Sequence, residues 1–424
     1  MKNKNAEILD AREQRANNIA FFLNENNAVV SVHANIPGNE KQTKHAYFLV
    51  RYYANMFLPE KVREAFYFDS SDGPYIILIF TNQEPIFLKE NAVILEEKDE
   101  LGRLIDIDVY TKGNNYHRVV MRKCLVCHKP AHECIRNKSH SKTEIFQVID
   151  HIVESSLETI ISDQIDFAMT TELDLDPKFG LVTKFSSGSH KDMDYSLMLQ
   201  AKKAIIPYLV KIFLTSFKSY SKDDIFAHAR LIGLEAEVAM GKTTNNINSY
   251  KGLIFSLGLL LSACGYELGR SSKLADIFDT VKSVVKDITA ELNQGEDTYG
   301  KVAYKKFGFT GARGEAESGF VNVQKSMNLL QDFSEKSLNR ALVFLISNCE
   351  DTVFLKRSRS IQKYELYKQI FSELTDYSKQ NLNNLTSRCI KENLSFGGSA
   401  DLLIASVFMK KYQQIFYSIQ EQNN

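Results

Sequence analysis

The spacing of apolar residues divides the chain into two stretches of different character. In the first stretch, helical spacing over Glu7–Glu25 is followed by Val- and Ile-rich runs at Ala28–His33 and Tyr75–Phe80, and by strict alternation over Leu104–Tyr110. These patterns indicate helices and strands mixed within one domain. From about Thr143 onward, apolar residues recur every three to four positions to the end of the chain, which predicts helices alone.

The boundary between the two stretches has no linker rich in Pro, Gly or Ser. Turn sequences at Pro37-Gly38, Asp72-Gly73-Pro74 and Gly113-Asn114 all lie within the first stretch. We place the boundary near residue 155, within the interval from His140 to Leu173. The sequence therefore predicts a multidomain protein, with an α/β (α+β) domain over residues 1–155 and an all-α domain over residues 156–424.

Composition and charge narrow the class of protein. The chain has 424 residues, 44% of them hydrophobic, which is enough apolar material for more than one core. Its 52 basic and 52 acidic residues cancel, so we expect no nucleic acid and no membrane as partners. The longest apolar run, Gly252–Gly265, is shorter than the roughly 20 residues of a membrane-spanning helix and predicts a buried helix. Six cysteines make a poor disulfide framework in a chain of this size, and the start lacks a signal-peptide pattern, so we expect a cytoplasmic protein.

Two aspartates share one face of the strand predicted at residues 104–110. The two-residue period of a strand places Asp106 and Asp108 on one face and the intervening apolar residues on the other. Neighbouring carboxylates repel each other unless a divalent cation such as Mg²⁺ supplies the opposite charge and bridges phosphate oxygens. The pattern is typical of phosphoryl or nucleotidyl transfer. The alternative is an ordinary half-buried strand that shows two aspartates to water.

Three cations near this strand are candidates for phosphate binding. Arg103 and Arg51 carry guanidinium groups that can bind phosphate through paired hydrogen bonds. For Arg51 we favour the alternative of a solvated surface arginine. Lys41, just after the Pro-Gly turn, is a similar loop candidate.

A cluster of three cysteines and one histidine follows: Cys124, Cys127, Cys134 and His140. This spacing can close a tetrahedral Zn²⁺ site, which would be structural. His128 and His132 compete with His140 for the place of the fourth ligand. The alternative is that reduced cysteines act as small hydrophobic residues beside a basic loop.

Four segments of the first stretch carry, in order, a resemblance to a known family: Arg12-Glu13-x-Arg15, Asn35-Ile36-Pro37-Gly38, Gly102–Val109 and Arg122–His140. They resemble the citrate lyase holo-acyl-carrier-protein synthases, which are phosphoribosyl-dephospho-CoA transferases with a nucleotidyltransferase-like domain. The resemblance implies that a serine of the apo acyl-carrier (gamma) subunit of citrate lyase attacks a triphosphate-bearing precursor, and that pyrophosphate leaves. It also implies that Asp106 and Asp108 hold the metal.

Six segments that join small residues to a charge interrupt the helices of the second stretch: Pro177–Val182, Gly188–Asp194, Arg230–Glu237, Asn248–Phe255, Gly311–Ala316 and Gly397–Asp401. Loops of this kind at helix ends present backbone N–H groups to phosphates, while nearby Lys or Arg neutralise the charge. We therefore expect a polyphosphate substrate. Met240–Thr243 has the tail of a phosphate-binding loop, but it lies inside a helical pattern, and we reject that interpretation.

The six segments, in this order, resemble the triphosphoribosyl-dephospho-CoA synthases over about residues 165–415. The resemblance implies that a ribose hydroxyl of 3'-dephospho-CoA attacks the anomeric carbon of the ribose of ATP, and that adenine departs. Such a centre gains oxocarbenium character, so a base for the hydroxyl and an acid for adenine both help. Candidate carboxylates for these roles, or for Mg²⁺, are Asp192, Asp194, Glu237, Asp351 and Asp401. Candidate substrate or phosphate contacts are Lys178, His190, Asn248, Lys251, Arg313 and Ser399, together with Asp351 and Asp401.

The chain departs from this family pattern at six positions: Phe179, Asn245, Asn246, Tyr250, Val353 and Phe396. Asn245 and Asn246 replace glycines, and Asn tolerates left-handed backbone. Tyr250 replaces a histidine and Val353 an asparagine, so two possible substrate contacts are lost. We predict a bifunctional transferase whose helical half makes the substrate of its α/β half. Two alternatives stay open: the helical half serves only for docking or scaffolding, or the carrier belongs to malonate decarboxylase.

Overall fold

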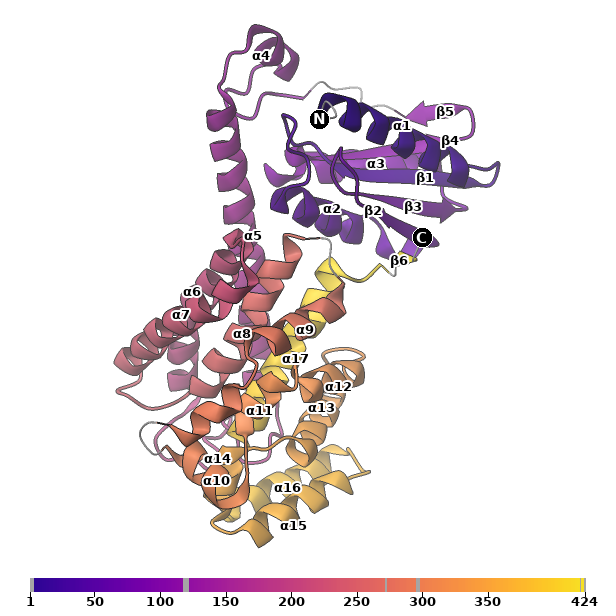
Figure 1. The fold of residues 1–424 in the computed structure, drawn as a ribbon. Helices are drawn as coiled ribbons and strands as arrows, with labels where there is room; N and C mark the ends of the chain where they lie inside the picture. The colour runs from indigo at the N-terminus through magenta and orange to yellow at the C-terminus, as the bar shows by residue number, and fades with distance from the viewer. Residues whose placement is uncertain (1–3, 117–121, 271–272, 295–297, 420, 423–424) are drawn as a thin grey trace. The chain divides into compact units, whose positions relative to one another are not determined.

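The computed structural model describes residues 4–116, 122–270, 273–294, 298–419 and 421–422, and the chain divides into two compact units (Figure 1). The first, which we call the sheet unit, contains residues 1–159, 267–273 and 413–424. The second, the helical unit, contains residues 160–266 and 274–412. The predicted order of an α/β part followed by an all-α part is confirmed.

The sheet unit is built on six strands: β1 (Asn27–Ala34), β2 (Glu64–Phe68), β3 (Tyr75–Thr81), β4 (Ile105–Thr111), β5 (Asn114–Tyr116) and β6 (Glu421–Gln422). Their order across the sheet is β5-β4-β1-β3-β2-β6. Neighbouring strands are antiparallel except β2 and β6, which are parallel. The β1–β4 register sets His33 opposite Asp106 and Ser31 opposite Asp108, so these four side chains share one face.

Helices cover both faces of this sheet: α1 (Lys4–Phe22), α2 (Lys44–Met56) and α3 (Pro85–Glu97). Figure 1 shows α1 over one face, with α2 and α3 on the other side of the sheet. Under α1, Ile19 packs with Val29 and Ile77 in an apolar cluster. That cluster fills only part of the α1 face, because Ser31 and His33 continue the same face with polar side chains.

The rest of the sheet unit consists of short helices and the start of a long one: η1 (Pro59–Lys61), η2 (Leu101–Leu104), α4 (Ala131–Asn137) and α5 (Lys142–Asp174). The first part of α5, up to Thr159, belongs to the sheet unit. The same helix then continues into the helical unit without a break.

The end of the chain is also part of the sheet unit. Asn55 of α2 donates a hydrogen bond to the carbonyl of Phe416 (2.9 Å) and accepts one from the N–H of Ile419 (2.9 Å). The guanidinium of Arg51 lies 4.6 Å from the ring centroid of Tyr417. Arg51 is buried, so the expected solvated surface arginine was wrong: stacking on aromatic rings takes it out of water.

The helical unit contains twelve further α-helices and one 3₁₀ helix among its described residues: α6 (Tyr195–Lys218), α7 (Lys222–Thr243), α8 (Lys251–Leu268), α9 (Leu274–Val284), η3 (Ile288–Asn293), α10 (Tyr299–Phe307), α11 (Gly311–Glu317), α12 (Val321–Leu329), α13 (Glu335–Asn348), α14 (Thr352–Ser358), α15 (Ile361–Ser372), α16 (Lys379–Lys391) and α17 (Gly397–Phe416). The apolar run Gly252–Gly265 lies in α8, which is long and apolar enough to cross a membrane but is mostly buried within the protein. The predicted buried helix is thus confirmed. Met240–Thr243 forms the last turn of α7, which agrees with our rejection of a phosphate-binding loop there.

Candidate active sites

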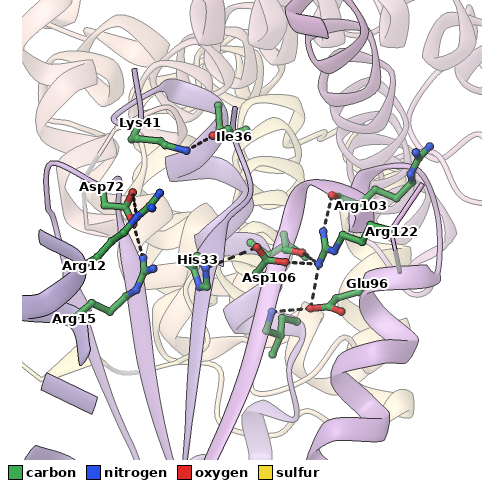
Figure 2. Close-up of polar contacts among 12 residues, drawn as sticks. Arg12, Arg15, His33, Ile36, Lys41, Asp72, Glu96, Arg103, Asp106 and Arg122 are labelled. Atoms are coloured by element: carbon green, nitrogen blue, oxygen red, sulfur yellow. Dashed lines mark hydrogen bonds and ion pairs between the residues drawn. The ribbon is translucent and has the colours of Figure 1, made fainter. Parts of the chain in front are cut away.

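The two aspartates of β4 lie opposite His33 and Ser31 of β1 and share their face of the sheet, as the alternation predicts. Figure 2 shows Asp106 beside His33 on this face. Arg122 Nη2 pairs with Asp106 Oδ1, and the other carboxylate oxygen of Asp106 lies 3.8 Å from His33 Nε2. Asp108 is half-buried and has no ion pair with any residue that the structure describes. Asp108 is therefore the carboxylate of this pair that is open to a cation.

His33 lies between positive side chains in the floor of this site. Burial, followed by the charges of Arg15 and Arg122, lowers the pKa of His33 to about 3, so the imidazole is neutral at physiological pH. Its Nδ1 atom and the hydroxyl of Ser31 are buried and have no hydrogen-bond partner among the described residues. Unpartnered buried polar atoms are costly unless a ligand or water completes them. These two atoms can bind a polar ligand, and Mg²⁺ binding by the two carboxylates stays a prediction.

Cations from α1 and a nearby loop border the same face (Figure 2). Arg12 Nε and Arg15 Nη1 each lie 3.1 Å from a carboxylate oxygen of Asp72. Lys41 donates a hydrogen bond to the carbonyl of Ile36, and burial lowers the pKa of Lys41. Sequence reasoning placed Arg12 and Arg15 in a resemblance motif but did not select them as site residues.

Arg103 and Arg122 join the strand to the segment that follows it. Arg103 Nη2 donates to the carbonyls of Lys123 (3.0 Å) and Cys124 (2.7 Å). Arg122 in turn donates to the carbonyls of Arg103 (2.8 Å) and Ile105 (2.6 Å). Arg103 thus holds the cysteine segment against β4, and phosphate binding by Arg103 stays a prediction.

The predicted cluster of cysteines and histidine is brought together: one donor atom from each of Cys124, Cys127, Cys134 and His140 lies within 4.8 Å of all the others. The Sγ atoms of Cys127 and Cys134 are 3.4 Å apart, and His140 Nε2 lies 3.2 Å from Cys127 Sγ. Ligands at about 2.0–2.3 Å from a tetrahedral Zn²⁺ have separations of this size. The cluster can therefore bind a metal such as zinc, with His140 as its fourth member rather than His128 or His132.

Backbone amides support a thiolate in this cluster. Burial by itself raises the pKa of the Cys124 thiol, but hydrogen bonds from the N–H groups of Cys127 and Val126, together with those from the Cys134 and Cys127 side chains, outweigh burial. The pKa of Cys124 therefore lies below its ordinary value. A thiolate is the form of cysteine that binds metals.

The helical unit contains a cavity of about 540 Å³. Six predicted residues line it: Lys178, His190, Asn248, Lys251, Arg313 and Asp401. They come from the loop after α5, the start of α8, the short helix α11 and the start of α17. Long-range packing thus gathers most of the predicted substrate contacts of the helical stretch around one cavity, of a size typical of ligand sites.

Asp401 is the predicted carboxylate that faces this cavity. It makes no hydrogen bond or ion pair with any residue that the structure describes. Burial, followed by the charges of Asp351 and Glu172, raises the pKa of Asp401 well above its ordinary value. A Cβ atom at Gly252 would collide with Asp401 Oδ2 unless the carboxyl turned, so α8 approaches this carboxyl closely.

Glu315 and Tyr250 are two further polar residues of the cavity wall, and sequence reasoning did not select either as a site residue. Burial raises the pKa of Glu315, whose Oε1 accepts a hydrogen bond from Asn322. Glu315 Oε2 and the Tyr250 hydroxyl have no partner among the described residues, and Tyr250 is only 2% exposed. Both atoms are therefore able to bind a ligand.

Lys178 lies in the wall as part of a buried ion pair. Its ammonium group is 2.9 Å from Glu172 Oε1 and donates to the carbonyls of Glu172 (2.8 Å) and Leu173 (3.5 Å). Burial lowers the pKa of Lys178, and the Glu172 carboxylate opposes that effect. Because all three donors of the ammonium are used, phosphate binding by Lys178 requires this pair to open, and it stays a prediction.

His190 is held neutral and oriented by its neighbours. Arg357 Nη2 lies 3.0 Å from Nδ1, and Ser395 Oγ lies 2.9 Å from Nε2. Burial, followed by the charge of Arg357, lowers the pKa of His190 to about 4. Because a guanidinium only donates, Nδ1 must accept and Nε2 carries the proton. Arg357 was missed, since nothing in its local sequence distinguishes it from a surface arginine.

Asp351 and Ser399 lie behind the cavity wall. Asp351 Oδ1 accepts hydrogen bonds from the N–H groups of Val353 and Phe354 (3.0 Å each) at the start of α14. Asp351 Oδ2 accepts from the N–H (2.8 Å) and hydroxyl (3.0 Å) of Ser399 at the start of α17. The carboxylate therefore caps two helices at once, and these N–H groups are already used. Substrate contacts by Asp351 and Ser399 stay predictions.

Glu350 has a matching role at a third helix start. Its Oε2 accepts from the N–H groups of Thr310 (2.6 Å) and Gly311 (3.2 Å) at the start of α11. The starts of α11, α14 and α17 are thus capped by the protein's own carboxylates. Side-chain cations are the remaining groups that can meet phosphate in the cavity, and Lys301, which also lines it, adds to Lys251 and Arg313.

Three of the five candidate carboxylates of the helical stretch, Asp192, Asp194 and Glu237, lie outside the lining of this cavity. The Asp192 side chain is 62% exposed, 3.9 Å from His190 Nδ1. Asp194 caps α6 by accepting a hydrogen bond from the N–H of Leu197 (2.9 Å). Glu237 pairs with Lys251 Nζ at 2.7 Å, so it reaches the cavity only through that lysine. Their catalytic roles stay predictions.

Two of the departures from the family pattern, Asn245 and Asn246, fit the local backbone. Asn245 and Asn246 have φ angles of 53° and 63°, so both occupy the left-handed region, as expected for residues in place of glycine. Phe179 and Phe396 are buried and pack on Phe371, with ring centroids 4.9 Å and 5.1 Å away. These phenylalanines therefore fill space in the core beside the cavity.

Comparisons with known proteins agree with the two-part organisation. The family described as ATP:dephospho-CoA triphosphoribosyl transferase matches residues 159–419, and the family described as apo-citrate lyase phosphoribosyl-dephospho-CoA transferase matches residues 4–156. These descriptions imply ATP, dephospho-CoA and the apo-citrate lyase carrier as partners.

Curated relatives cover either the whole chain or its helical part. The chain is 29% identical to "Protein CitXG" of Leuconostoc mesenteroides subsp. cremoris, over 90% of this chain and 91% of that protein. It is 31% identical to "Protein CitXG" of Haemophilus influenzae, over 77% of each. It is 32% identical to 2-(5''-triphosphoribosyl)-3'-dephosphocoenzyme-A synthase of Haemophilus ducreyi, over 67% of this chain and 98% of that protein. The chain belongs to the ATP:dephospho-CoA triphosphoribosyl transferase family, and an apo-citrate lyase phosphoribosyl-dephospho-CoA transferase part precedes that region. It is a bifunctional transferase with both activities.

Proposed function

We propose that the cavity of the helical unit is where a ribose hydroxyl of 3'-dephospho-CoA displaces adenine from ATP. The observation that carries this proposal is that Asp401 lines the same cavity as cations able to hold a triphosphate. Lys251, Lys301 and Arg313 supply the positive charge. Arg313 Nε lies 3.5 Å from Glu291 Oε2 without a hydrogen bond, so the guanidinium can turn to a phosphate.

Asp401 and Glu315 divide the acid and base roles in this proposal. The new C–O bond forms at the anomeric carbon while the C–N bond to adenine breaks, so the hydroxyl loses a proton and adenine gains one. Asp401, whose pKa burial raises well above its ordinary value, keeps its proton and donates it to the departing adenine. Glu315, whose Oε2 has no partner among the described residues, accepts the hydroxyl proton.

The direct test is to incubate the full chain with ATP and 3'-dephospho-CoA and to measure adenine by chromatography. We expect adenine in equal amount to the triphosphoribosyl product. Release of ADP or pyrophosphate in place of adenine would overturn the proposal, because bond breaking would then lie at phosphorus.

Tyr250→Phe tests whether the free hydroxyl in the wall binds substrate. We expect kcat/KM for adenine release to fall about tenfold, the size of one lost hydrogen bond. The melting temperature should stay equal or rise, because a buried hydroxyl without a partner costs stability. The measurements are adenine-release kinetics and calorimetry.

Tyr412→Phe is the matched control, since the Tyr412 hydroxyl donates to the carbonyl of Cys264 at 3.2 Å, inside the core. It should lower the melting temperature and leave the kinetics unchanged. If Tyr250→Phe behaves in the same way as this control, the Tyr250 hydroxyl has no part in substrate binding.

We propose that the sheet unit performs the transfer at Asp106 and Asp108. A serine oxygen of the carrier forms a bond to the phosphorus next to the ribose, the bond to pyrophosphate breaks, and the serine proton is lost to water. Mg²⁺, if bound by Asp106 and Asp108, would neutralise the charge of the phosphate oxygens. Arg12, Arg15 and Lys41 stand on the same face, where they can orient the triphosphate.

We also propose that the cysteine and histidine cluster holds a structural Zn²⁺. His140→Ala is expected to lower the zinc content from about one ion per chain to nearly none, because a tetrahedral site loses one of its four ligands. The melting temperature of the sheet unit should fall with it. The measurements are elemental analysis and thermal unfolding.

His132→Ala is the control for this change, because His132 is exposed and lies outside the cluster. It should keep its zinc. Loss of zinc from His132→Ala with retention in His140→Ala would show that the fourth ligand has been misassigned.

A further inference from the structure

A second cavity, of about 980 Å³, lies in the sheet unit. Its walls are the loop at Asn35 and Pro37, the end of α3 with the turn that follows, and the segment from Arg122 to Ile145. The volume lies in the range of roughly 300–1,000 Å³ found for small-molecule sites. The chemistry assigned above to Asp106 and Asp108 does not use this space.

Arg122 connects the cavity to the acidic face of β4. Its guanidinium lines the cavity, pairs with Asp106, and lies 3.4 Å from Glu96 Oε1 (Figure 2). Asp106 therefore stands directly behind one wall residue of the cavity. A ligand in the cavity that carries a phosphate chain would extend past Arg122 towards the two carboxylates.

The wall carries positive charge without protein partners. Lys123, Lys138 and Lys142 line the cavity, and none forms an ion pair within the described ranges of the chain. Three carboxylates share the wall: Glu96, which pairs with Arg122, Asp99, which accepts a hydrogen bond from the N–H of Gly102 (2.9 Å), and Glu97. With Arg103 and Arg122, the cations of the wall outnumber these carboxylates, which favours an anionic ligand.

The wall also carries apolar surface. Pro37, Leu125, Val126 and Ile145 line the cavity together with Ile135, whose surface is 77% exposed. A large aliphatic side chain in this position has no protein neighbour to cover it, and a ligand with a flat or flexible apolar part would do so. Apolar surface beside unpaired lysines fits a molecule that has both phosphates and an extended organic part.

We propose that this cavity binds the dephospho-CoA part of the triphosphoribosyl precursor during transfer. The adenine and pantetheine portions lie on the apolar wall around Ile135. The diphosphate of dephospho-CoA lies near Lys123 and Lys142, while the triphosphate end passes Arg122 to Asp106 and Asp108. The inference rests on the transfer activity proposed for the sheet unit.

Charge reversal of two lysines tests the inference in the full chain. Lys123→Glu and Lys142→Glu should each raise the KM for ready-made triphosphoribosyl-dephospho-CoA about tenfold at low salt, because attraction to phosphate becomes repulsion. Both side chains are exposed, and Glu is favourable at the first position of α5, so the fold should be kept. Ile135→Glu should act in the same direction. Lys129→Glu, an exposed change in the same segment but outside the cavity, should leave this KM unchanged.

Three readouts separate the outcomes. The inference is supported if the KM for the precursor rises while the KM for the apo carrier and the rate of adenine release stay constant. It is overturned if the precursor KM is unchanged, or if only the carrier KM rises, which would assign the cavity to the carrier. If the unmodified chain transfers nothing from ready-made precursor, the transfer activity itself is wrong, which is a distinct result.

Discussion

Asp401→Asn is expected to slow adenine release by about 10²–10⁴-fold, the usual contribution of general acid catalysis. Asn has nearly the same shape as a protonated carboxyl group, so the cavity should keep its form while losing the proton that adenine needs. Asp401 has no protein partner to lose among the described residues, and the melting temperature should therefore change little. Adenine-release kinetics at saturating ATP and dephospho-CoA measure the effect.

The pH dependence of the same reaction has a defined sign. Because Asp401 is proposed to donate a proton to adenine, its protonated form is the active one. The rate should therefore fall as the pH rises through the raised pKa of Asp401. Asp279→Asn, an exposed change on α9 away from the cavity, is the matched control and should keep the normal rate and pH profile. A normal rate in Asp401→Asn would remove Asp401 from the mechanism.

Asp108→Asn is expected to slow transfer to the carrier by at least about 100-fold, because one of the two anionic groups proposed to hold the cation is neutralised. Adenine release should be unchanged, since the substitution lies in the other unit. The measurement is transfer from ready-made precursor, followed by the mass of the carrier. Asp10→Asn, an exposed change on α1, is the control with normal transfer expected.

Mixing the two variants provides a sharper test of the division of labour. Asp401→Asn and Asp108→Asn should each fail to modify the carrier from ATP and dephospho-CoA, whereas an equal mixture should succeed. The precursor made by one chain then serves the other in solution. Failure of the mixture, with each variant active in its own half-reaction, would mean that the precursor does not leave the chain that made it.

The sheet unit shows which features can be predicted from local sequence. The alternation that places Asp106 and Asp108 on one face is a two-residue pattern, and it is correct because the opposite face, at Ile105 and Ile107, is buried. The pairing of β2 with residues at the far end of the chain has no such local signal. Arg51 was misjudged for the same reason, because Tyr417 becomes its neighbour only after the chain has folded.

In the helical unit, the residues that line the cavity were easier to predict than the role of each residue. Motifs placed His190, Lys251, Arg313 and Asp401 near one another, and all four line the same cavity. Motif reasoning could not tell which acidic groups face inward, because that depends on contacts between distant helices. Asp351 was selected as a substrate contact, yet its oxygens cap two helices.

Glu315 and Arg357 are side chains of the candidate site that the sequence did not reveal. Glu315 lies within a segment used for the resemblance, but its unpartnered Oε2 is visible only in the folded chain. Arg357 fixes the tautomer of His190 from α14, far away in sequence. Burial and partner geometry, rather than residue type, distinguish these side chains from ordinary surface charges.

The most direct test of the account is the intact mass of purified apo-citrate lyase carrier after incubation with this chain, ATP, 3'-dephospho-CoA and Mg²⁺. The account predicts a gain equal to one phosphoribosyl-dephospho-CoA group, with one adenine released per group attached. It further predicts that Asp401→Asn abolishes this gain and that ready-made precursor restores it. An unmodified carrier with the unaltered chain, even when the ready-made precursor is supplied, would contradict the account.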